Sequence, residues 1–317
     1  MNTTSPVLLL IYNRPAHTEQ VMAQLREAEP PKLFVAADGP RTDQPDDAER
    51  CERARDVATH VDWDCNVHTL FRDENLGCKK AVSSAITWFF DHVEEGIILE
   101  DDCVPHCTFF PYCSHLLERY RGDERVMVVS GNNFQPARRS YDASYYFSAY
   151  SHCWGWATWK QSWEHYNGDL ETWSELREKE WLQGWLGSEA IAQYWKSIFD
   201  RVARGDIDSW AYAWTFSCWT QHGLSVLPSK NLVTNIGFGA HATHTNAKDG
   251  ETGHLSTYPM LFPMEDPANV VRNYAADEYT AHSHFGIKTG LRRWVDRHTP
   301  ELIKRAARSI IGGSYGY

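Results

Sequence analysis

The chain has 317 residues, enough for one large domain or two smaller ones, and its 42% hydrophobic residues can form a substantial core. With 31 Lys and Arg against 42 Asp and Glu, the net charge of −11 excludes a general nucleic-acid binder, which would carry a basic surface. The eight cysteines include no CxxC pair, no signal peptide precedes the first predicted strand, and no apolar run is long enough to span a membrane. These features predict a cytoplasmic protein with reduced thiols.

The first hundred residues alternate between short apolar runs and amphipathic segments. The apolar runs predict strands, at 6–12, 32–37, 67–71 and 96–99. The amphipathic segments predict helices, one starting at Thr18 and the others over 49–60 and 79–92. Strand and helix in regular alternation is the pattern of a doubly wound α/β sheet with mostly parallel strands.

Three consecutive carboxylates, Glu100, Asp101 and Asp102, directly follow the last of these strands. Because a bare charge is costly to bury, the strand must emerge from the core here, at its carboxyl end. Open α/β sheets bind ligands at that edge. Adjacent carboxylates repel one another, and a divalent cation is the simplest way to offset the repulsion. Hard oxygen ligands suit Mg²⁺ or Mn²⁺, with water or phosphate oxygens completing the coordination. An acidic turn without a ligand is the alternative; the buried strand before it favours the metal site.

The second half of the chain has a different composition. After a helix over 109–121 and a strand over 125–131, the sequence becomes rich in aromatic residues from Asn132 onward. Further helices are expected around 173–185, 188–204 and 210–221, followed by a short strand at 224–228 and a glycine-rich loop over 236–245. We therefore divide the chain into a donor-binding half at 1–131, an acceptor-side half of the same domain at 132–250, and a C-terminal extension at 251–317.

The C-terminal extension carries the basic charge that the rest of the chain lacks. Residues 288–308 hold seven Lys and Arg against two acids, so this segment is +5 and the remainder is −16. With Leu291, Trp294, Val295 and the apolar residues up to Ile311, it predicts a basic amphipathic helix. Such a helix over 288–311 can lie on an anionic membrane surface, here the inner face of the plasma membrane, or dock on the acidic body of its own or a second subunit. The sequence leaves both possibilities, and the oligomeric state, open.

As a set, the motifs resemble those of GT-A-fold glycosyltransferases. The similarity is nearest to bacterial nucleotide-sugar transferases of the family-2 or haemolysin-like kind, and more distant to the animal N-acetylglucosaminyltransferase I family. It spans about 6–245 and is carried by Tyr12-Asn13-Arg14-Pro15, Asp38-Gly39, Asn75-Leu76-Gly77, Glu100-Asp101-Asp102, Trp154-Gly155-Trp156 and the segment 231–245.

The resemblance implies a GT-A (Rossmann-like) fold and a metal-dependent enzyme that uses a nucleotide sugar. In the family, the last acid of the triplet binds Mn²⁺ or Mg²⁺ directly, which gives this role to Asp102. Glu100 and Asp101 then contact metal-bound water, the ribose or the donor sugar. The metal would stabilise the diphosphate leaving group as a Lewis acid.

The resemblance also assigns residues to the nucleotide. Asp38 is similar to a strand-end acid that accepts a hydrogen bond from the base, and its alternative role is an Asp-Gly turn. Asn13 and Arg14 are expected beside the nucleotide, although Pro15 at a helix entrance also explains that turn. Asn75 and Gly77 precede a helix whose N-terminus attracts anions, and Lys79 either adds charge there or is solvated.

On the acceptor side, the resemblance points to Asp208 as the general base that deprotonates the acceptor hydroxyl. Relatives often carry an acid in the Trp-x-Tyr-x-Trp segment that follows, where this chain has Ala211. The alternative role of Asp208 is the N-cap of the helix that begins at Trp210, a cap that Ser209 could also provide. Trp154 and Trp156 are expected to form a wall beside a sugar, or to lie in the core.

Two loop histidines, His241 and His244, are candidates to complete the metal site, and we assign His244 to it. Their alternative is a hydrogen bond to a backbone carbonyl.

Together these features predict an inverting hexosyl- or N-acetylhexosaminyltransferase of polysaccharide biosynthesis. It would move a sugar from a UDP-sugar to a hydroxyl of a glycan or lipid-linked acceptor. One rival is a sugar-nucleotide nucleotidyltransferase, but such enzymes usually have a Gly-rich phosphate loop where this chain has Tyr12-Asn13-Arg14-Pro15. The other is a non-catalytic carbohydrate-binding protein on the same fold, against which the intact acid triplet argues.

Overall fold

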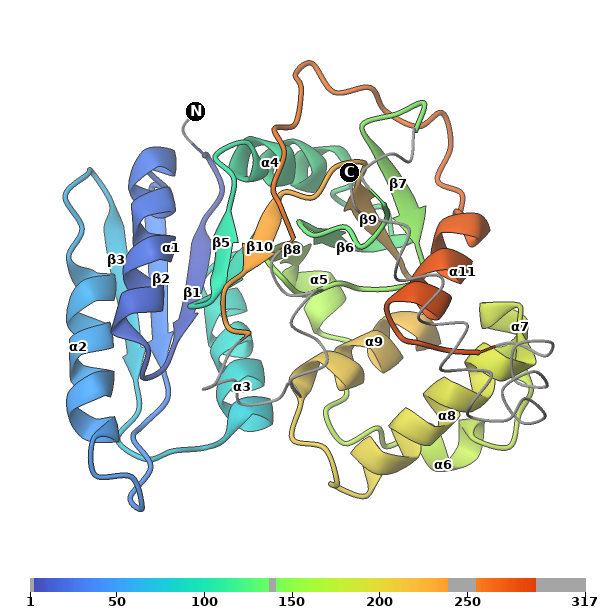
Figure 1. Ribbon diagram of the computed structural model, residues 1–317, viewed down its shortest axis with the longest axis horizontal. Helices are drawn as coiled ribbons and strands as arrows, with labels where there is room; N and C mark the ends of the chain where they lie inside the picture. The colour runs from blue at the N-terminus through green and yellow to red at the C-terminus, as the bar shows by residue number, and fades with distance from the viewer. Residues whose placement is uncertain (1–2, 137–140, 239–254, 289–317) are drawn as a thin grey trace, which may run out of the picture.

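A computed structural model describes residues 3–136, 141–238 and 255–288 (Figure 1). Its centre is an eight-stranded sheet in the order β3-β2-β1-β4-β8-β6-β9-β7, and four of its neighbouring pairs are parallel. The strands of this sheet are β1 (Val7–Ile11), β2 (Lys32–Ala37), β3 (Asn66–Phe71), β4 (Glu95–Glu100), β6 (Val126–Ser130), β7 (Tyr145–Ser148), β8 (Trp156–Trp159) and β9 (Leu224–Pro228). A separate antiparallel pair consists of β5 (Cys103–Pro105) and β10 (Val233–Asn235).

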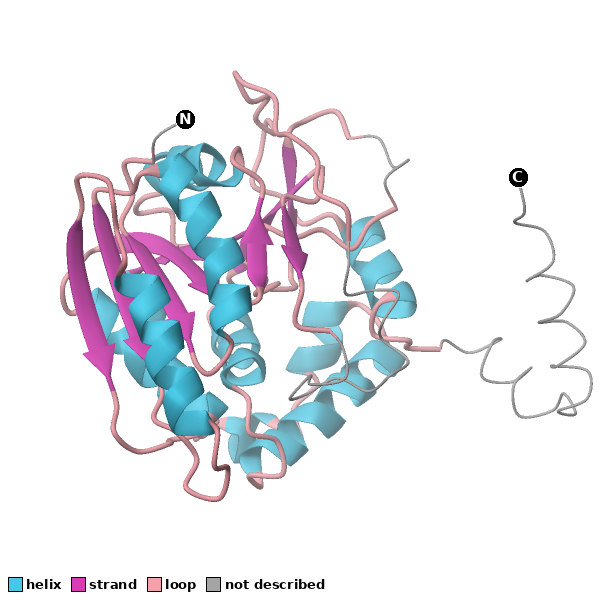
Figure 2. Ribbon diagram, turned by 60° about the vertical axis from the view of Figure 1, so that its left-hand side comes forward, coloured by secondary structure: helices cyan, strands magenta, loops and turns pink. Residues whose placement is uncertain are grey.

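Helices cover both faces of the large sheet, and Figure 2 shows them in front of the strands and behind them. One core cluster joins the sheet to α1 (Pro15–Ala28), α2 (Asp47–Thr59) and α4 (Phe109–Arg119). The other cluster joins the opposite face to α3 (Cys78–Phe90), α5 (Lys160–Trp163), α6 (Trp173–Leu176), α7 (Trp181–Leu186), α8 (Glu189–Ala203), α9 (Trp210–Thr220) and part of α11 (Tyr274–Ser283). The expected α/β class, a mixed and mostly parallel sheet flanked by helices, is thereby confirmed.

The register of the central strands decides where polar residues gather. Ile11 lies opposite Ala37, and Leu10 lies opposite both Ala36 and Glu100. The residues that follow these parallel strands therefore emerge together at one edge of the sheet. The apolar runs of β1, β2 and β4 are buried on both faces. The first charged residue at the carboxyl end of each strand therefore marks the edge of the core.

Three local features differ from the sequence expectation. Helix α1 starts at Pro15 rather than at Thr18, because proline has a fixed φ and no N–H and is well suited to the first helical position. Strand β3 forms the edge of the sheet and is mostly exposed. Strand β8 was not expected: Trp156–Trp159 pairs antiparallel with both β4 and β6 in the middle of the sheet. Its sequence lacks the period of two that reveals a half-buried strand, since both of its faces are buried.

The basic helix expected over 288–311 lies, apart from Lys288, outside the described residues, as do His241 and His244. The division of the chain at 131 and 250 stays a prediction. Within the described part of the chain, no helix combines the length and apolar character needed to cross a bilayer.

Candidate active site

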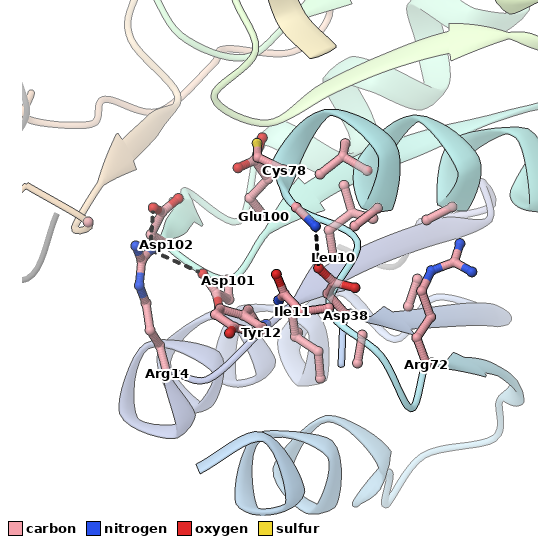
Figure 3. Close-up of a pocket in the computed structure, with 18 of the residues that line it drawn as sticks. Leu10, Ile11, Tyr12, Arg14, Asp38, Arg72, Cys78, Glu100, Asp101 and Asp102 are labelled. Atoms are coloured by element: carbon pink, nitrogen blue, oxygen red, sulfur yellow. Dashed lines mark hydrogen bonds and ion pairs between the residues drawn. The ribbon is translucent and has the colours of Figure 1, made fainter. Parts of the chain in front are cut away.

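A cavity of about 460 Å³ opens at the carboxyl ends of β1, β2 and β4 (Figure 3). Its floor is apolar and comes from β1, β2 and α3, through Leu10, Ala36, Ala81, Val82 and Ala85. Its rim is polar and charged, and is formed by Tyr12, Arg14, Asp38, Arg41, Arg72, Asn75, Glu100, Asp101, Asp102, Asp208 and Asn235. An apolar floor with converging polar groups is the usual character of a small-molecule site.

The acid triplet lies at the carboxyl end of β4, and Arg14, directly before α1, faces it (Figure 3). The guanidinium Nη1 lies 2.9 Å from Asp102 Oδ2 and 3.5 Å from Asp101 Oδ1. The other oxygen of Asp101, Oδ2, accepts a hydrogen bond from the Tyr12 backbone N–H at 3.2 Å. Burial raises the pKa of Asp101, and the neighbouring Asp102 raises it further. The pKa of Glu100 is also raised, by burial first and then by the repulsion of Asp102 and Asp101. One guanidinium therefore does not neutralise the three carboxyl groups.

Asp102 is held from its other side by the segment that follows β10. Asn235 Nδ2 donates to Asp102 Oδ1 at 3.2 Å, and the Gly237 backbone N–H donates to Asn235 Oδ1 at 2.7 Å. A Cβ atom at Gly237 would lie 2.2 Å from Asp102 Oδ2, so a larger residue there would have to displace the Asp102 carboxylate. Asn235 and Gly237 were not singled out from the sequence, although both fall inside the segment 231–245 that carries the resemblance.

Asp38 fixes the loop that leads into α3. Its carboxylate accepts from the backbone N–H groups of Gly39, Leu76 and Gly77 at 3.0–3.1 Å. Asn75 completes the contact by donating from Nδ2 to the Gly39 carbonyl at 2.8 Å. Asp38 thus lines the cavity and also acts as the turn residue of the alternative interpretation; its contact with a base stays a prediction.

Asp208 reaches the same helix from the acceptor side. Its two oxygens accept from the backbone N–H groups of Cys78 and Lys79, each at 3.0 Å, so it caps the N-terminus of α3 from a distant loop. Gly77, with φ of +78°, gives the chain the turn that brings these amides together. The alternative expected from the sequence, a cap of the helix that begins at Trp210, is wrong: the N-cap position of α9 is Ser209, without a side-chain cap bond, and Asp208 instead caps α3 while it also lines the cavity.

A buried carboxylate that sequence reasoning missed organises the wall behind the cavity. Asp47, at the start of α2, accepts from Tyr12 Oη and Asn13 Nδ2 at 2.7 Å, and from Arg41 Nε at 2.6 Å. The hydrogen bond from Arg41 lowers the pKa of Asp47 well below its usual range, while burial and Asp47 raise that of Tyr12. In the sequence Asp47 is one acid among several in a polar stretch, so no pattern distinguishes it.

The structure brings most of the predicted site residues together around the cavity. They are Arg14, Asp38, Asn75, Gly77, Glu100, Asp101, Asp102, Trp154 and Asp208. Cavity-lining residues that the sequence did not point to include Arg41, Arg72, Cys78 and Phe238.

Three predicted residues lie elsewhere. Asn13 is buried behind the wall as a partner of Asp47. Lys79 turns away from the cavity and pairs with Asp169 at 2.9 Å. Trp156 is 1% exposed on β8 and stacks on Trp210 in the core, with ring centroids 5.3 Å apart, so the core alternative is the correct one. Trp154, by contrast, does line the cavity.

The donor set has the chemistry for a divalent cation that is shared with a ligand. Among the described residues, no three His, Cys, Asp or Glu side chains form a ready metal cage. Mg²⁺, however, is commonly held by one or two carboxylates together with substrate phosphates and water. Asp102 offers such a carboxylate at the cavity rim, and a cation there would relieve the repulsion among the carboxyl groups that helps to raise the pKa of Glu100 and Asp101.

No protein-family model and no curated protein sequence matches this chain. Among solved structures, a cytidylyltransferase from Leptospira borgpetersenii is 11% identical, with a TM-score of 0.30, and the match covers 52% of this chain and 63% of that one. A UDP-glucose pyrophosphorylase complexed with UDP-glucose is 9% identical, with a TM-score of 0.27 and coverage of 46% and 62%. The glycosyltransferase GlyE of Streptococcus pneumoniae is 11% identical, with a TM-score of 0.34 and coverage of 70% and 45%. All three matches span less than two thirds of the neighbour's own chain. Similarity at this level carries no argument about activity, which must rest on the residues of this chain.

Proposed function

We propose that this chain is a metal-dependent, inverting glycosyltransferase that moves a sugar from a UDP-sugar to a hydroxyl of a glycan or lipid-linked acceptor. The observation that carries the proposal is the acid triplet with Arg14, at the mouth of a 460 Å³ cavity on the carboxyl edge of a parallel sheet. That edge is where α/β enzymes bind nucleotides.

The inner part of the cavity suits a nucleoside. Small apolar side chains of β2 and α3, such as Ala36 and Ala81, leave room for a flat base. Asn75 uses its Nδ2 on a backbone carbonyl, which leaves its Oδ1 to accept from an N–H group of the base. Asp38, beside it, is held by three backbone amides and offers a fixed negative charge at the same edge.

The outer part suits a diphosphate. Arg14 and Arg41 both line the rim, and guanidinium groups bind phosphate oxygens through two parallel hydrogen bonds. Asp102 would hold the divalent cation, with Glu100 and Asp101 beside it. The cation would supply Lewis-acid stabilisation of the leaving diphosphate.

Asp208 is our candidate for the general base. It lines the cavity at the N-terminus of α3, whose first two amides it caps. Each of its oxygens accepts one backbone hydrogen bond and keeps a lone pair for an acceptor hydroxyl. Trp154 and Phe238, whose ring centroids lie 5.4 Å apart, form an aromatic wall against which a sugar ring can pack.

The proposal also includes a lipid-linked acceptor and peripheral contact with a membrane. They are supported by the basic, Trp-containing sequence of 288–311.

The test is a panel of UDP-hexoses and UDP-N-acetylhexosamines incubated with Mn²⁺ or with a chelator. We expect Mn²⁺-dependent release of UDP from one donor, at a slow rate without acceptor and a faster rate with one. Asp102→Ala should abolish it. Asp169→Ala is the matched control, because the Asp169 side chain is 85% exposed and pairs with Lys79 outside the cavity. Release of pyrophosphate from UTP and a sugar 1-phosphate would instead identify a nucleotidyltransferase.

A further inference from the structure

Arg14 occupies the space between two of the carboxylates that would hold a metal ion. Its Nη1 contacts Asp102 Oδ2 at 2.9 Å and Asp101 Oδ1 at 3.5 Å, so a positive charge already lies between the two acids (Figure 3). The three side chains are only 19%, 14% and 8% exposed, in the order Arg14, Asp102 and Asp101. Water therefore screens this pairing less than it screens an exposed ion pair.

The remaining oxygens of the two acids are also occupied. Asp102 Oδ1 accepts from Asn235 Nδ2 at 3.2 Å, and Asp101 Oδ2 accepts from the Tyr12 backbone N–H at 3.2 Å. Those two donors lie at strand ends: Asn235 is the last residue of β10, and Tyr12 directly follows β1. The contact that can yield to an incoming cation is the one made by the long Arg14 side chain.

The backbone of Arg14 is anchored independently of its side chain. Its carbonyl accepts from the Thr18 backbone N–H and from Thr18 Oγ1, both at 3.0 Å, as part of the first turn of α1. A movement of the guanidinium therefore costs no helix structure. A diphosphate at the cavity rim would offer it more negative charge, with a better fork geometry, than the two carboxylates do.

We propose that Arg14 is a charge switch that couples diphosphate binding to metal binding. Without nucleotide, it pairs with Asp101 and Asp102 and competes with the divalent cation. When the donor diphosphate draws the guanidinium away, Asp102 Oδ2 becomes available to the cation. Because coupling between two ligands is reciprocal, the diphosphate and the cation each raise the affinity of the other by the same factor. Arg14 itself competes with the metal alone and supplies a contact to the diphosphate alone. This inference rests on the proposed function, since it assumes that metal and diphosphate share the site.

The experiment measures each ligand separately on the full chain. Mn²⁺ binding without nucleotide is followed by electron paramagnetic resonance, and UDP binding in the presence of a chelator by calorimetry. We expect Arg14→Gln to bind Mn²⁺ about tenfold more tightly than the wild type and UDP about tenfold more weakly, the size expected for one charge-assisted contact. Arg41→Gln is the matched control: it removes an arginine from the same rim, but one that pairs with Asp47 rather than with the triplet. Its Mn²⁺ affinity should stay within about twofold of the wild type.

The outcomes separate the switch from the proposed function. If Arg14→Gln binds Mn²⁺ no more tightly than Arg41→Gln does, the switch is wrong, even where wild-type protein binds Mn²⁺ together with UDP. If the wild type binds no Mn²⁺ even with UDP, the proposed metal site fails and the switch fails with it. Circular dichroism confirms that each variant is folded. Should Arg14→Gln unfold, Arg14→Met serves instead: it keeps a long side chain without the positive charge, so Mn²⁺ alone should still bind more tightly than to the wild type.

Discussion

Asp208 and Cys78 are 130 residues apart in the chain, yet the Cys78 backbone N–H donates to Asp208 Oδ2 at 3.0 Å. The same carboxylate accepts from Lys79, so the loop between α8 and α9 is attached to the first turn of α3. This contact fixes the second half of the chain to the first beside the cavity. The helix cap that the structure shows and the general base that we propose are two roles for one side chain, and they predict different mutational effects.

Asparagine caps helices about as well as aspartate does, but it cannot accept a proton. We therefore expect Asp208→Asn to keep the wild-type melting temperature and UDP affinity while lowering kcat by two orders of magnitude or more. Asp208→Ala should in addition lose about 1 kcal/mol of stability, because two backbone donors of α3 lose their partner. Steady-state kinetics with thermal unfolding separates the two effects. Unchanged turnover in Asp208→Asn would leave Asp208 as a cap only.

Asp47 should stabilise the folded protein and also support nucleotide binding. Replacing it with Ala leaves the Tyr12 hydroxyl and the Asn13 amide without an acceptor and releases Arg41. We expect Asp47→Ala to cost about 3 kcal/mol in unfolding free energy and to weaken UDP binding, since the wall of the cavity loses its support. Asp46→Ala is the control, because Asp46 is exposed and makes no side-chain cap bond. Equal urea midpoints for the two variants would contradict this role.

Gly237 should be intolerant of a side chain. A Cβ atom there would lie 2.2 Å from Asp102 Oδ2, so Gly237→Ala must displace either the carboxylate or the loop. We expect this variant to lose Mn²⁺-dependent UDP binding by more than tenfold, with a fold that remains intact. Gly184→Ala, at a helical position with nothing within 4 Å, should bind UDP as the wild type does. Calorimetric titration of both variants checks the pair, and wild-type binding by Gly237→Ala would contradict the packing described.

His152 should make the protein less stable in mild acid. Burial, with a smaller contribution from His284, lowers the pKa of His152 to about 3. Between that value and the unfolded value near 6.5, the unfolded chain binds a proton that the folded protein does not, so stability is present above pH 6.5 and is lost as the pH falls. From pH 7 to pH 5, this amounts to about 2 kcal/mol. Urea unfolding at both pH values should show a smaller loss for His152→Leu than for the wild type, whereas equal losses would rule this histidine out as the cause.

The sequence was sufficient to predict the layers of the fold and the edge that carries the site. Uninterrupted apolar runs reveal strands buried on both faces, and the charged residues that follow β1, β2 and β4 mark where those strands leave the core. Because the three strands are parallel and neighbouring, Arg14, Asp38 and the acid triplet meet at one edge.

Features that depend on tertiary contact could not be predicted in this way. Strand β8 is recognisable only once its neighbours β4 and β6 are in place, and with it Trp156 moves from the expected sugar wall into the core. The role of Asp47 depends on Tyr12, Asn13 and Arg41, which come from two separate segments. The hydrogen bond from Asn235 to Asp102 joins residues that are 133 positions apart in the chain. None of these contacts leaves a local period or spacing in the sequence.

The most direct test of the central claim is the melting temperature of the protein with UDP, in Mn²⁺ and in chelator, for the wild type and Asp102→Ala. A ligand that binds only the native state raises the melting temperature by mass action. A UDP-dependent rise that is larger with Mn²⁺ than with chelator, and that loses its Mn²⁺ increment in Asp102→Ala, is the predicted result. No rise with UDP in either condition, on folded wild-type protein, would contradict a nucleotide–metal site at the end of β4.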